Sequence, residues 1–134
     1  MKRDKMYSNY MTAYEDPSSR KNVYSYDIKD TEDLTKIMGL FPIVVVDVWA
    51  EWCEPCKKVS VLYEELAKRF LEAHQKRLVI FVRDNIDQPD SYHADKVQSI
   101  PTIFVYVNQE LVYRSDGYEE EKIVSLLQGW LQKK

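Results

Sequence analysis

The chain has 134 residues, of which 45% are hydrophobic and 31% are charged, as in a single globular domain with its own apolar core. Its net charge of −3 gives no general electrostatic attraction to nucleic acid or to an anionic membrane, so we expect neither as a partner. No stretch approaches the roughly 20 apolar residues that span a bilayer, and the basic start lacks the apolar segment of a secretory signal.

Residues 1–21 form a tyrosine-rich arm. Its tyrosines recur at the spacing of one helical face between Tyr7 and Tyr14, and Pro17 would end such a helix. A helix of this length is marginal alone, so a flexible tail is the equal alternative. The rest of the chain, residues 22–134, is predicted as one domain.

The domain begins with a predicted strand and helix. The sequence "VYSYDI" (23–28) alternates as a half-buried strand does. The helix that follows covers residues 30–39, where Asp30 or Thr31 can cap the N-terminus and Gly39 stands at the expected C-terminus.

The middle of the domain is predicted as strand, long helix and strand. The β-branched run "IVVVDVWA" (43–50) indicates a strand covered on both faces, and "RLVIFV" (77–82) indicates a second buried strand. Residues 54–74 carry an apolar stripe at helical spacing. The stripe consists of Val59, Leu62, Tyr63, Leu66 and Phe70.

Residues 90–98 are predicted as a short helix, and two strands follow at 101–107 and 111–115, with residues 108–110 as the hairpin loop. A final helix covers residues 119–132. Its inward side chains are predicted to be Ile123, Leu127, Trp130 and Leu131. The order β-α-β-α-β-α-β-β-α predicts an α/β fold, with a central five-stranded mixed sheet flanked by four helices.

Both cysteines of the chain stand in one tetrapeptide, Cys53-Glu54-Pro55-Cys56, between the 43–50 strand and the next helix. The free amide groups and dipole of a helix N-terminus favour a thiolate, so we expect the pKa of Cys53 to lie below its usual value of about 8.5. Pro55 is compatible with a first helical turn. Cys56 can resolve a mixed disulfide on Cys53, which predicts dithiol–disulfide exchange in a reducing compartment.

Asp47 interrupts the most hydrophobic strand of the chain. Burial should raise the pKa of this carboxyl, which could then take up the proton that Cys56 must lose. The alternative is that Asp47 reaches solvent or pairs with a lysine such as Lys57. Of the two nearby tryptophans, Trp49 and Trp52, we expect one in the core and the other as an apolar surface beside the thiols.

The segment "VVVDVWAEWCEPCKKVSVLYEELA" resembles the active-site segment of thioredoxins, whose pattern is V-D-F-W-A-x-W-C-G-P-C-K. "DNIDQ" (84–88), "SIPT" (99–102), the hairpin, Gly117 and the last helix follow in the family's order, so the resemblance covers about residues 22–134. It implies the thioredoxin fold, with the arm as an N-terminal extension.

The resemblance also implies a role for each site residue. Cys53 would be the exposed nucleophile, Cys56 the buried resolving thiol and Asp47 the buried acid, with the Cys53–Cys56 disulfide as the redox-active group. Pro101 would be a cis-proline facing the thiols. Residues expected to contact the substrate are Trp52, Glu54, Pro55, Ser99, Ile100, Pro101 and Gly117.

The activity implied is the reduction of disulfides in other proteins, without a bound cofactor or metal. A thioredoxin reductase using NADPH, or another dithiol donor, would restore the reduced form. We expect a cytoplasmic monomer.

The sequence departs from the family pattern at four positions. Glu54 replaces the usual glycine, and its carboxylate opposes the Cys53 thiolate. This predicts a pKa of Cys53 that is higher than it would be with glycine at position 54, and a more reducing couple. Arg83 stands where the family has a lysine, and it keeps its charge. Ser99 replaces a glycine and should narrow the substrate groove, and Val61 stands where a proline often kinks the long helix.

Four other functions were considered. In a metal site the two cysteines would need His74 and His93 as further ligands, but the spacing of the four residues does not fit a zinc finger. We expect both histidines at the surface. "CEPCKK" also resembles the extracytoplasmic reductases of cytochrome c maturation, which normally carry a membrane anchor and a central insertion that we do not see here. A thioredoxin-like adaptor and a disulfide isomerase or oxidase remain as alternatives.

Overall fold

The computed structural model describes residues 24–72 and 78–132, so the predicted arm, with its helix or tail, lies outside the described part. The strands are β1 (Tyr26–Asp27), β2 (Ile43–Trp49), β3 (Val79–Asn85), β4 (Thr102–Val107) and β5 (Glu110–Asp116), and the described helices are α2 (Thr31–Leu40), α3 (Glu54–Glu72) and α4 (Glu120–Gln132). The five strands form one sheet in the order β1-β3-β2-β4-β5. β3 pairs in parallel with β1 and β2, whereas β4 is antiparallel to both β2 and β5, so the sheet is mixed, as predicted.

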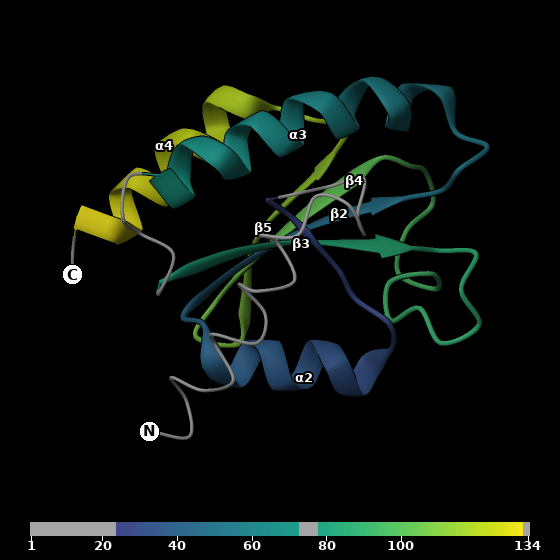
Figure 1. Cartoon of the computed structure of the whole chain (residues 1–134), viewed down its shortest axis with the longest axis horizontal. Helices are drawn as coiled ribbons and strands as arrows, with labels where there is room; N and C mark the ends of the chain where they lie inside the picture. The colour runs from purple at the N-terminus through teal and green to yellow at the C-terminus, as the bar shows by residue number, and fades with distance from the viewer. Residues whose placement is uncertain (1–23, 73–77, 133–134) are drawn as a thin grey trace.

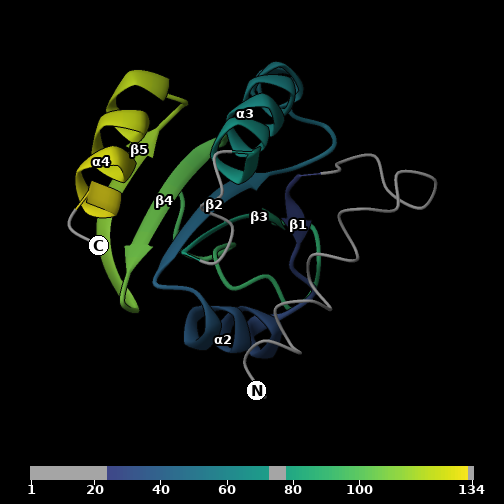
Figure 2. The ribbon, with the colours of Figure 1, turned by 60° about the vertical axis from the view of Figure 1, so that its left-hand side comes forward.

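Helices cover both faces of the sheet, with α2 on one side and α3 and α4 on the other (Figures 1 and 2). Val44, Val46 and Val48 of β2 belong to the apolar cluster that includes α2. The alternate residues Ile43 and Val45 belong to the cluster of α3 and α4. Apolar partners on both sides explain why this strand is hydrophobic without alternation.

Helix α2 begins as the sequence predicts and ends differently. The side chain of Asp30 accepts a hydrogen bond from the Asp33 N–H, so Asp30 is the N-cap. The expectation for Gly39 was wrong: the helix continues to Leu40, and Phe41, with φ −119°, is the C-cap. The buried Leu40 completes the apolar stripe of the helix, which favours one more residue in it.

The predicted helix at 90–98 is absent, so the described part of the chain has three helices where the sequence led us to expect four. The segment consists of turns and bends. In an α-helix each N–H donates to the carbonyl four residues earlier. Here the Ser91 N–H donates to the Gln88 carbonyl and the Lys96 N–H to the His93 carbonyl, which are only three residues earlier. Side-chain bonds to Asp84 compete further with helix formation.

Two smaller differences concern the hairpin and α3. The turn consists of Asn108 and Gln109 alone, both with positive φ (51° and 72°) as a type I′ turn requires, and Glu110 already pairs with Val107 in the sheet. Leu62, which we expected in the buried stripe of α3, is 45% exposed, whereas Tyr63 is fully buried. Among the described residues, no helix is long and apolar enough to cross a membrane.

The position of Gly39 within α2 generates a stability prediction. A Cβ at Gly39 would meet no atom within 4 Å, and alanine costs less backbone entropy in a helix than glycine. We expect Gly39→Ala to raise the free energy of unfolding by about 1 kcal/mol in urea denaturation.

Two other glycines serve as controls. A Cβ at Gly129, in helix α4, would also meet no atom within 4 Å, so Gly129→Ala should raise the free energy of unfolding by a similar amount. Gly117→Ala should destabilise, because Gly117 has φ +94°. A loss of stability in Gly39→Ala would contradict the helical position of this residue.

Candidate active site

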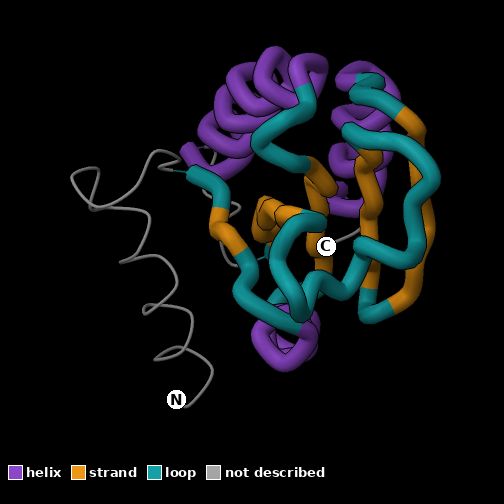
Figure 3. The backbone as a smooth tube through the Cα atoms, turned by 90° about the vertical axis from the view of Figure 1, so that its right-hand side faces the viewer, coloured by secondary structure: helices purple, strands orange, loops and turns teal. Residues whose placement is uncertain are grey.

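The candidate site lies at the end of the sheet where β2 passes into α3. Figure 3 looks onto this end and shows loops crossing in front of the strand ends. β2 ends at Trp49 and α3 begins at Glu54, so the tetrapeptide stands at the strand-to-helix junction, as predicted. The last paired residues of β2 and β4 in this direction are Val48 and Thr102, which brings the 99–101 segment next to the junction.

The two cysteines form a disulfide, with their Cα atoms 5.2 Å apart. Cys53 directly precedes α3, and its Sγ accepts a hydrogen bond from the Cys56 N–H at 3.2 Å. This is the geometry of a side-chain N-cap, with sulfur in place of the usual oxygen. Cys53 is 5% exposed and Cys56 is 1% exposed, so the expectation of an exposed Cys53 was wrong for this disulfide form. Cys53 nevertheless lines the cleft described below, whereas Cys56 does not.

The 99–101 segment faces Cys53 from the start of β4. The Ile100–Pro101 peptide bond is cis, as the resemblance implies, and the Ile100 carbonyl oxygen lies 3.8 Å from Cys53 Sγ. The Pro101 carbonyl accepts a hydrogen bond from the Gly117 N–H at 2.8 Å, and the Thr102 hydroxyl donates to the Ser99 carbonyl at 2.7 Å. The backbone beside the thiols is therefore bonded on both sides of the proline.

A cleft of about 450 Å³ opens beside Cys53. Of the residues predicted to contact substrate, five line it: Trp52, Glu54, Pro55, Ser99 and Ile100. The two others do not. Pro101 is buried, and Gly117, which follows β5, donates a hydrogen bond to its carbonyl.

Four residues that line the cleft were not predicted: Ile86, Ala94, Val97 and Gln98. Ile86 lies within "DNIDQ", one of the segments that carried the resemblance, so the sequence did contain a signal that this residue belongs near the site. The other three belong to the segment that was predicted as a helix. Their contribution depends on where that segment lies, which its sequence does not indicate.

The two tryptophans differ in exposure, as expected. Trp49 packs against the cluster of Ala50 and the two cysteines. Trp52 is 66% exposed, and its indole Nε1–H donates to Asp87 at 3.3 Å. Trp52 therefore offers the mouth of the cleft an apolar surface with a fixed orientation.

Asp47 is fully buried and pairs with Arg83, whose Nε lies 3.2 Å from Asp47 Oδ2. Burial raises the pKa of Asp47 to about 6, against the opposing effect of the Arg83 charge. The alternative expectation, solvent contact or a pair with Lys57, was wrong, because Lys57 pairs with Glu54 at 3.0 Å. Within the described residues, Asp47 Oδ1 is buried without a hydrogen-bond partner.

Arg83 is itself surrounded by partners. Its guanidinium carbon lies 4.1 Å from the centre of the Trp49 ring, which permits a cation–π contact. The Arg83 charge also lowers the pKa of Glu64, although burial, the larger effect, leaves that pKa raised overall. A carboxylate and an aromatic face therefore compensate the buried cation.

His93 is fully buried, so the expectation of a surface histidine was wrong; His74 lies outside the described residues. Its Nδ1 lies 2.7 Å from Asp84 Oδ2, and its Nε2 lies 2.9 Å from the Tyr106 hydroxyl. Both ring nitrogens are thus used in hydrogen bonds. In the part of the chain that the structure describes, no group of three or more histidine, cysteine or acidic residues could hold a metal ion.

The comparisons with known proteins agree with this geometry. A family model described as Thioredoxin matches residues 10–129. Thioredoxin 1 of Chlorobaculum tepidum is 39% identical over 75 residues, which are 55% of this chain and 69% of that protein. The thioredoxin of Mycoplasma genitalium is 33% identical over 102 residues, which are 75% of this chain and 94% of that protein.

Solved structures give the same result for the fold. The thioredoxin of Fasciola hepatica superposes with a TM-score of 0.65 at 27% identity, over 77% of this chain and 96% of that one. The thioredoxin of Trypanosoma brucei brucei reaches a TM-score of 0.68 at 20% identity, over 81% of this chain and 91% of that one. The second similarity shows the fold alone.

The raised pKa of Asp47 predicts a pH dependence of stability. The folded protein binds this proton more tightly than the unfolded chain does, so the free energy of unfolding falls as the pH rises from 3.8 to about 6. The Asp47→Asn variant lacks the ionisation. The difference in free energy of unfolding, variant minus oxidised wild type, should therefore increase by about 2 kcal/mol between pH 4 and pH 8.

Urea denaturation at several pH values measures this difference. Asp95→Asn is the control, because the Asp95 side chain is 84% exposed and its removal should give an almost flat difference. An equally flat difference for Asp47→Asn would contradict the assignment of a raised pKa to this residue.

Proposed function

The chain belongs to the thioredoxin family and is a thiol–disulfide oxidoreductase that acts on protein disulfides, and from this premise we propose how the site residues divide the work. In the reduced protein, the Cys53 thiolate attacks one sulfur of a substrate disulfide, forms a mixed disulfide and releases the first substrate thiolate. The Cys56 thiolate then attacks Cys53 Sγ and releases the second. Two electrons pass to the substrate, and the Cys53–Cys56 disulfide remains.

The observation that carries this assignment is the unequal burial of two sulfurs at one helix start. Cys53 borders the cleft, whereas Cys56 does not line it and is almost fully buried. The free amide groups of the first turn of α3 favour a thiolate at Cys53, and the Cys56 N–H already bonds its sulfur. The order of attack follows from access.

We assign the proton of Cys56 to Asp47. Asp47 lies on the face of β2 that α3 covers, and Cys56 lies in the first turn of α3. A carboxyl whose pKa is about 6 is largely ionised near neutral pH, so it can accept the proton when Cys56 attacks and return it when the disulfide is reduced. Arg83 keeps this pKa from rising further, because its charge stabilises the carboxylate. Arg83 is thus a positioning residue for the acid.

Substrate binding is assigned to the cleft and to the backbone before Pro101. A polypeptide that lies along this backbone would place its cysteine against Cys53, at the position where the Ile100 carbonyl now lies 3.8 Å from the sulfur. Trp52 and Ile100 supply apolar contacts, and Ser99 adds a side chain where a glycine would leave space. Gly117 acts through its bond to Pro101.

Members of the family need no bound cofactor, because the two sulfurs carry the electrons, and they receive electrons from thioredoxin reductase. For this protein we propose an NADPH-dependent thioredoxin reductase as donor and action as a cytoplasmic monomer. The support is chemical: the cysteine pair has to be kept reduced, and a reducing compartment does so.

An adaptor role would use the same surface without the chemistry. Cys53→Ser and Cys56→Ser distinguish the two functions, because an adaptor would still bind its partner in both variants, whereas a reductase would lose its activity.

Cys56→Ser should trap the substrate. With insulin as substrate, we expect a stable mixed disulfide on Cys53 that non-reducing mass spectrometry detects, because the resolving thiol is absent. Cys53→Ser is the matched control and should form no adduct. Both variants should reduce insulin no faster than dithiothreitol alone, and full activity of either one would exclude the mechanism.

Glu54 should have a small effect on the redox potential. Its side chain is 81% exposed and pairs with Lys57, so solvent and the lysine both screen its charge from Cys53. We expect Glu54→Gly to make the couple less reducing by under about 30 mV, which is a factor of about ten in the equilibrium with glutathione.

Lys57→Gln tests the reason for this small effect. If Lys57 screens the charge, its removal should shift the potential in the opposite direction, toward a more reducing couple. A potential that changes in neither variant would remove the sequence-based hypothesis about Glu54.

A further inference from the structure

A buried hydrogen-bonded network lies on the side of the sheet that α2 covers. It consists of Asp84 at the end of β3, His93 in the segment that follows, and Tyr106 in β4. His93 is 0% exposed and Asp84 is 1% exposed. The thiol chemistry proposed above uses none of these groups.

Asp84 is the centre of the network. Its Oδ1 accepts a hydrogen bond from the Ser91 hydroxyl at 2.7 Å, and its Oδ2 accepts one from the His93 N–H at 3.0 Å. Oδ2 also lies 2.7 Å from His93 Nδ1. One strand residue thus bonds the following segment at three points.

We assign the ring proton of His93 from these contacts. Asp84 accepts at both oxygens, so His93 Nδ1 carries the proton that it donates, and Nε2 accepts from the Tyr106 hydroxyl at 2.9 Å. Burial, Tyr92 and Asp84 raise the pKa of Tyr106, which keeps its hydroxyl protonated. Every polar group of the network then has a partner.

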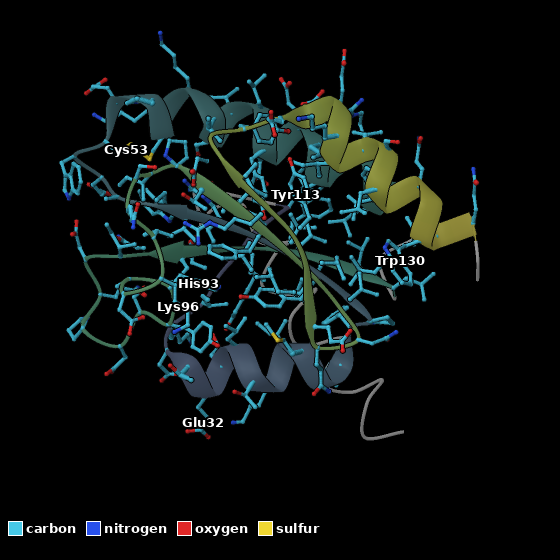
Figure 4. The ribbon with its side chains drawn as sticks, turned by 180° about the vertical axis from the view of Figure 1, so that it is seen from behind. Glu32, Cys53, His93, Lys96, Tyr113 and Trp130 are labelled. Carbon is cyan, nitrogen blue, oxygen red and sulfur yellow. A yellow bond between two sulfur atoms is a disulfide. The ribbon has the colours of Figure 1, made fainter. Side chains whose placement is uncertain are left out.

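The network stands directly behind one wall of the cleft. His93 precedes Ala94, and Val97, Gln98 and Ser99 follow within six residues, all four of them lining the cleft beside Cys53. Figure 4 labels His93 and Cys53 toward the same end of the molecule. This segment has no helix or strand of its own, so its position depends on its side-chain bonds and on the packing of Tyr92 and Val97 against the apolar cluster that includes α2.

Ring contacts reinforce the same placement. The His93 ring lies 4.6 Å from the Phe104 ring of β4 and 4.9 Å from the Tyr92 ring. Lys96 lies over Tyr92 and donates to its carbonyl at 3.0 Å. The segment is therefore attached to the sheet through His93 and folded onto itself through Lys96.

We propose that the Asp84–His93–Tyr106 network positions the 94–99 wall of the cleft and thereby determines the affinity for polypeptide substrates. The three residues act through the wall and touch neither the sulfurs nor the substrate. The proposal rests on the proposed function, because the affinity concerned is that for protein disulfides, which we measure as the KM.

Tyr106→Phe removes one oxygen and leaves His93 Nε2 buried without a donor. We expect the KM for insulin reduction, with dithiothreitol as the recycling reductant, to rise about tenfold, because an unpaired buried group loosens the wall. The kcat and the redox potential against glutathione should stay unchanged. The rate at which the variant reduces a small aromatic disulfide should also stay unchanged, because such a substrate does not need the 94–99 wall for binding.

His93→Gln is the conservative variant, because its amide can donate to Asp84 and accept from Tyr106. We expect it to retain the wild-type KM, whereas His93→Leu should raise it as Tyr106→Phe does. Ile37→Val, in the same apolar cluster but on α2, controls for a general loss of stability and should leave KM unchanged.

Amide hydrogen exchange of the oxidised protein tests the network without any activity. In Tyr106→Phe, the amides of residues 94–99 should exchange about tenfold faster, while those of α3 stay as in the wild type. Nitrogen NMR of the wild type should show the proton on Nδ1 of His93.

The outcomes separate the two proposals. Faster exchange of the wall with an increased KM supports the network as a positioning device. Unchanged exchange and unchanged KM in a folded Tyr106→Phe protein would overturn it, as would a rise in KM that Ile37→Val reproduces. Failure of the wild type to reduce insulin would instead overturn the proposed function and leave the exchange result to decide the network.

Discussion

The antiparallel pairing of β2 with β4 is the constraint on which the site depends. Val48 pairs with Thr102, so the chain that leaves β2 toward Cys53 lies beside the chain that enters β4 from Pro101. The nucleophile and the backbone that faces it are close because two strands share hydrogen bonds. A shift of one residue in this pairing would turn every side chain of β4 to the opposite face and dissolve the arrangement.

The same sheet contains a buried ion pair, whose desolvation costs free energy. Asp47 and Arg83 are paired neighbours in β2 and β3, on the face that α3 covers, and both are almost fully buried. A buried ion pair seldom stabilises a fold beyond what apolar residues would achieve. Burial also brings the pKa of the acid to about 6, and the proton transfer that we propose for Asp47 rests on this value.

The opposite face of the sheet has a second polar network, but its role is geometric. Asp84 lies next to Arg83 in β3 and points to the α2 side, where its carboxylate bonds Ser91 and His93. Two consecutive charged residues of one strand thus serve two faces. Arg83 pairs with Asp47, the acid of the proposed mechanism, and Asp84 bonds the irregular segment that borders the cleft. The alternation of side chains along a strand makes this division possible.

The sequence alone determined the order of the five strands, the presence of α2, α3 and α4 and the strand-to-helix position of the two cysteines, because hydrophobic periodicity and helix capping are local properties of the chain. It did not determine the partner of Asp47, the burial of His93 or the course of residues 90–98. The polar composition of that segment suits a short helix as well as a series of turns, and Asp84 and Tyr106, which decide between them, lie up to 13 residues away from His93. Only the tertiary structure brings these partners together, since a hydrogen bond between distant residues leaves no periodic signal in the sequence.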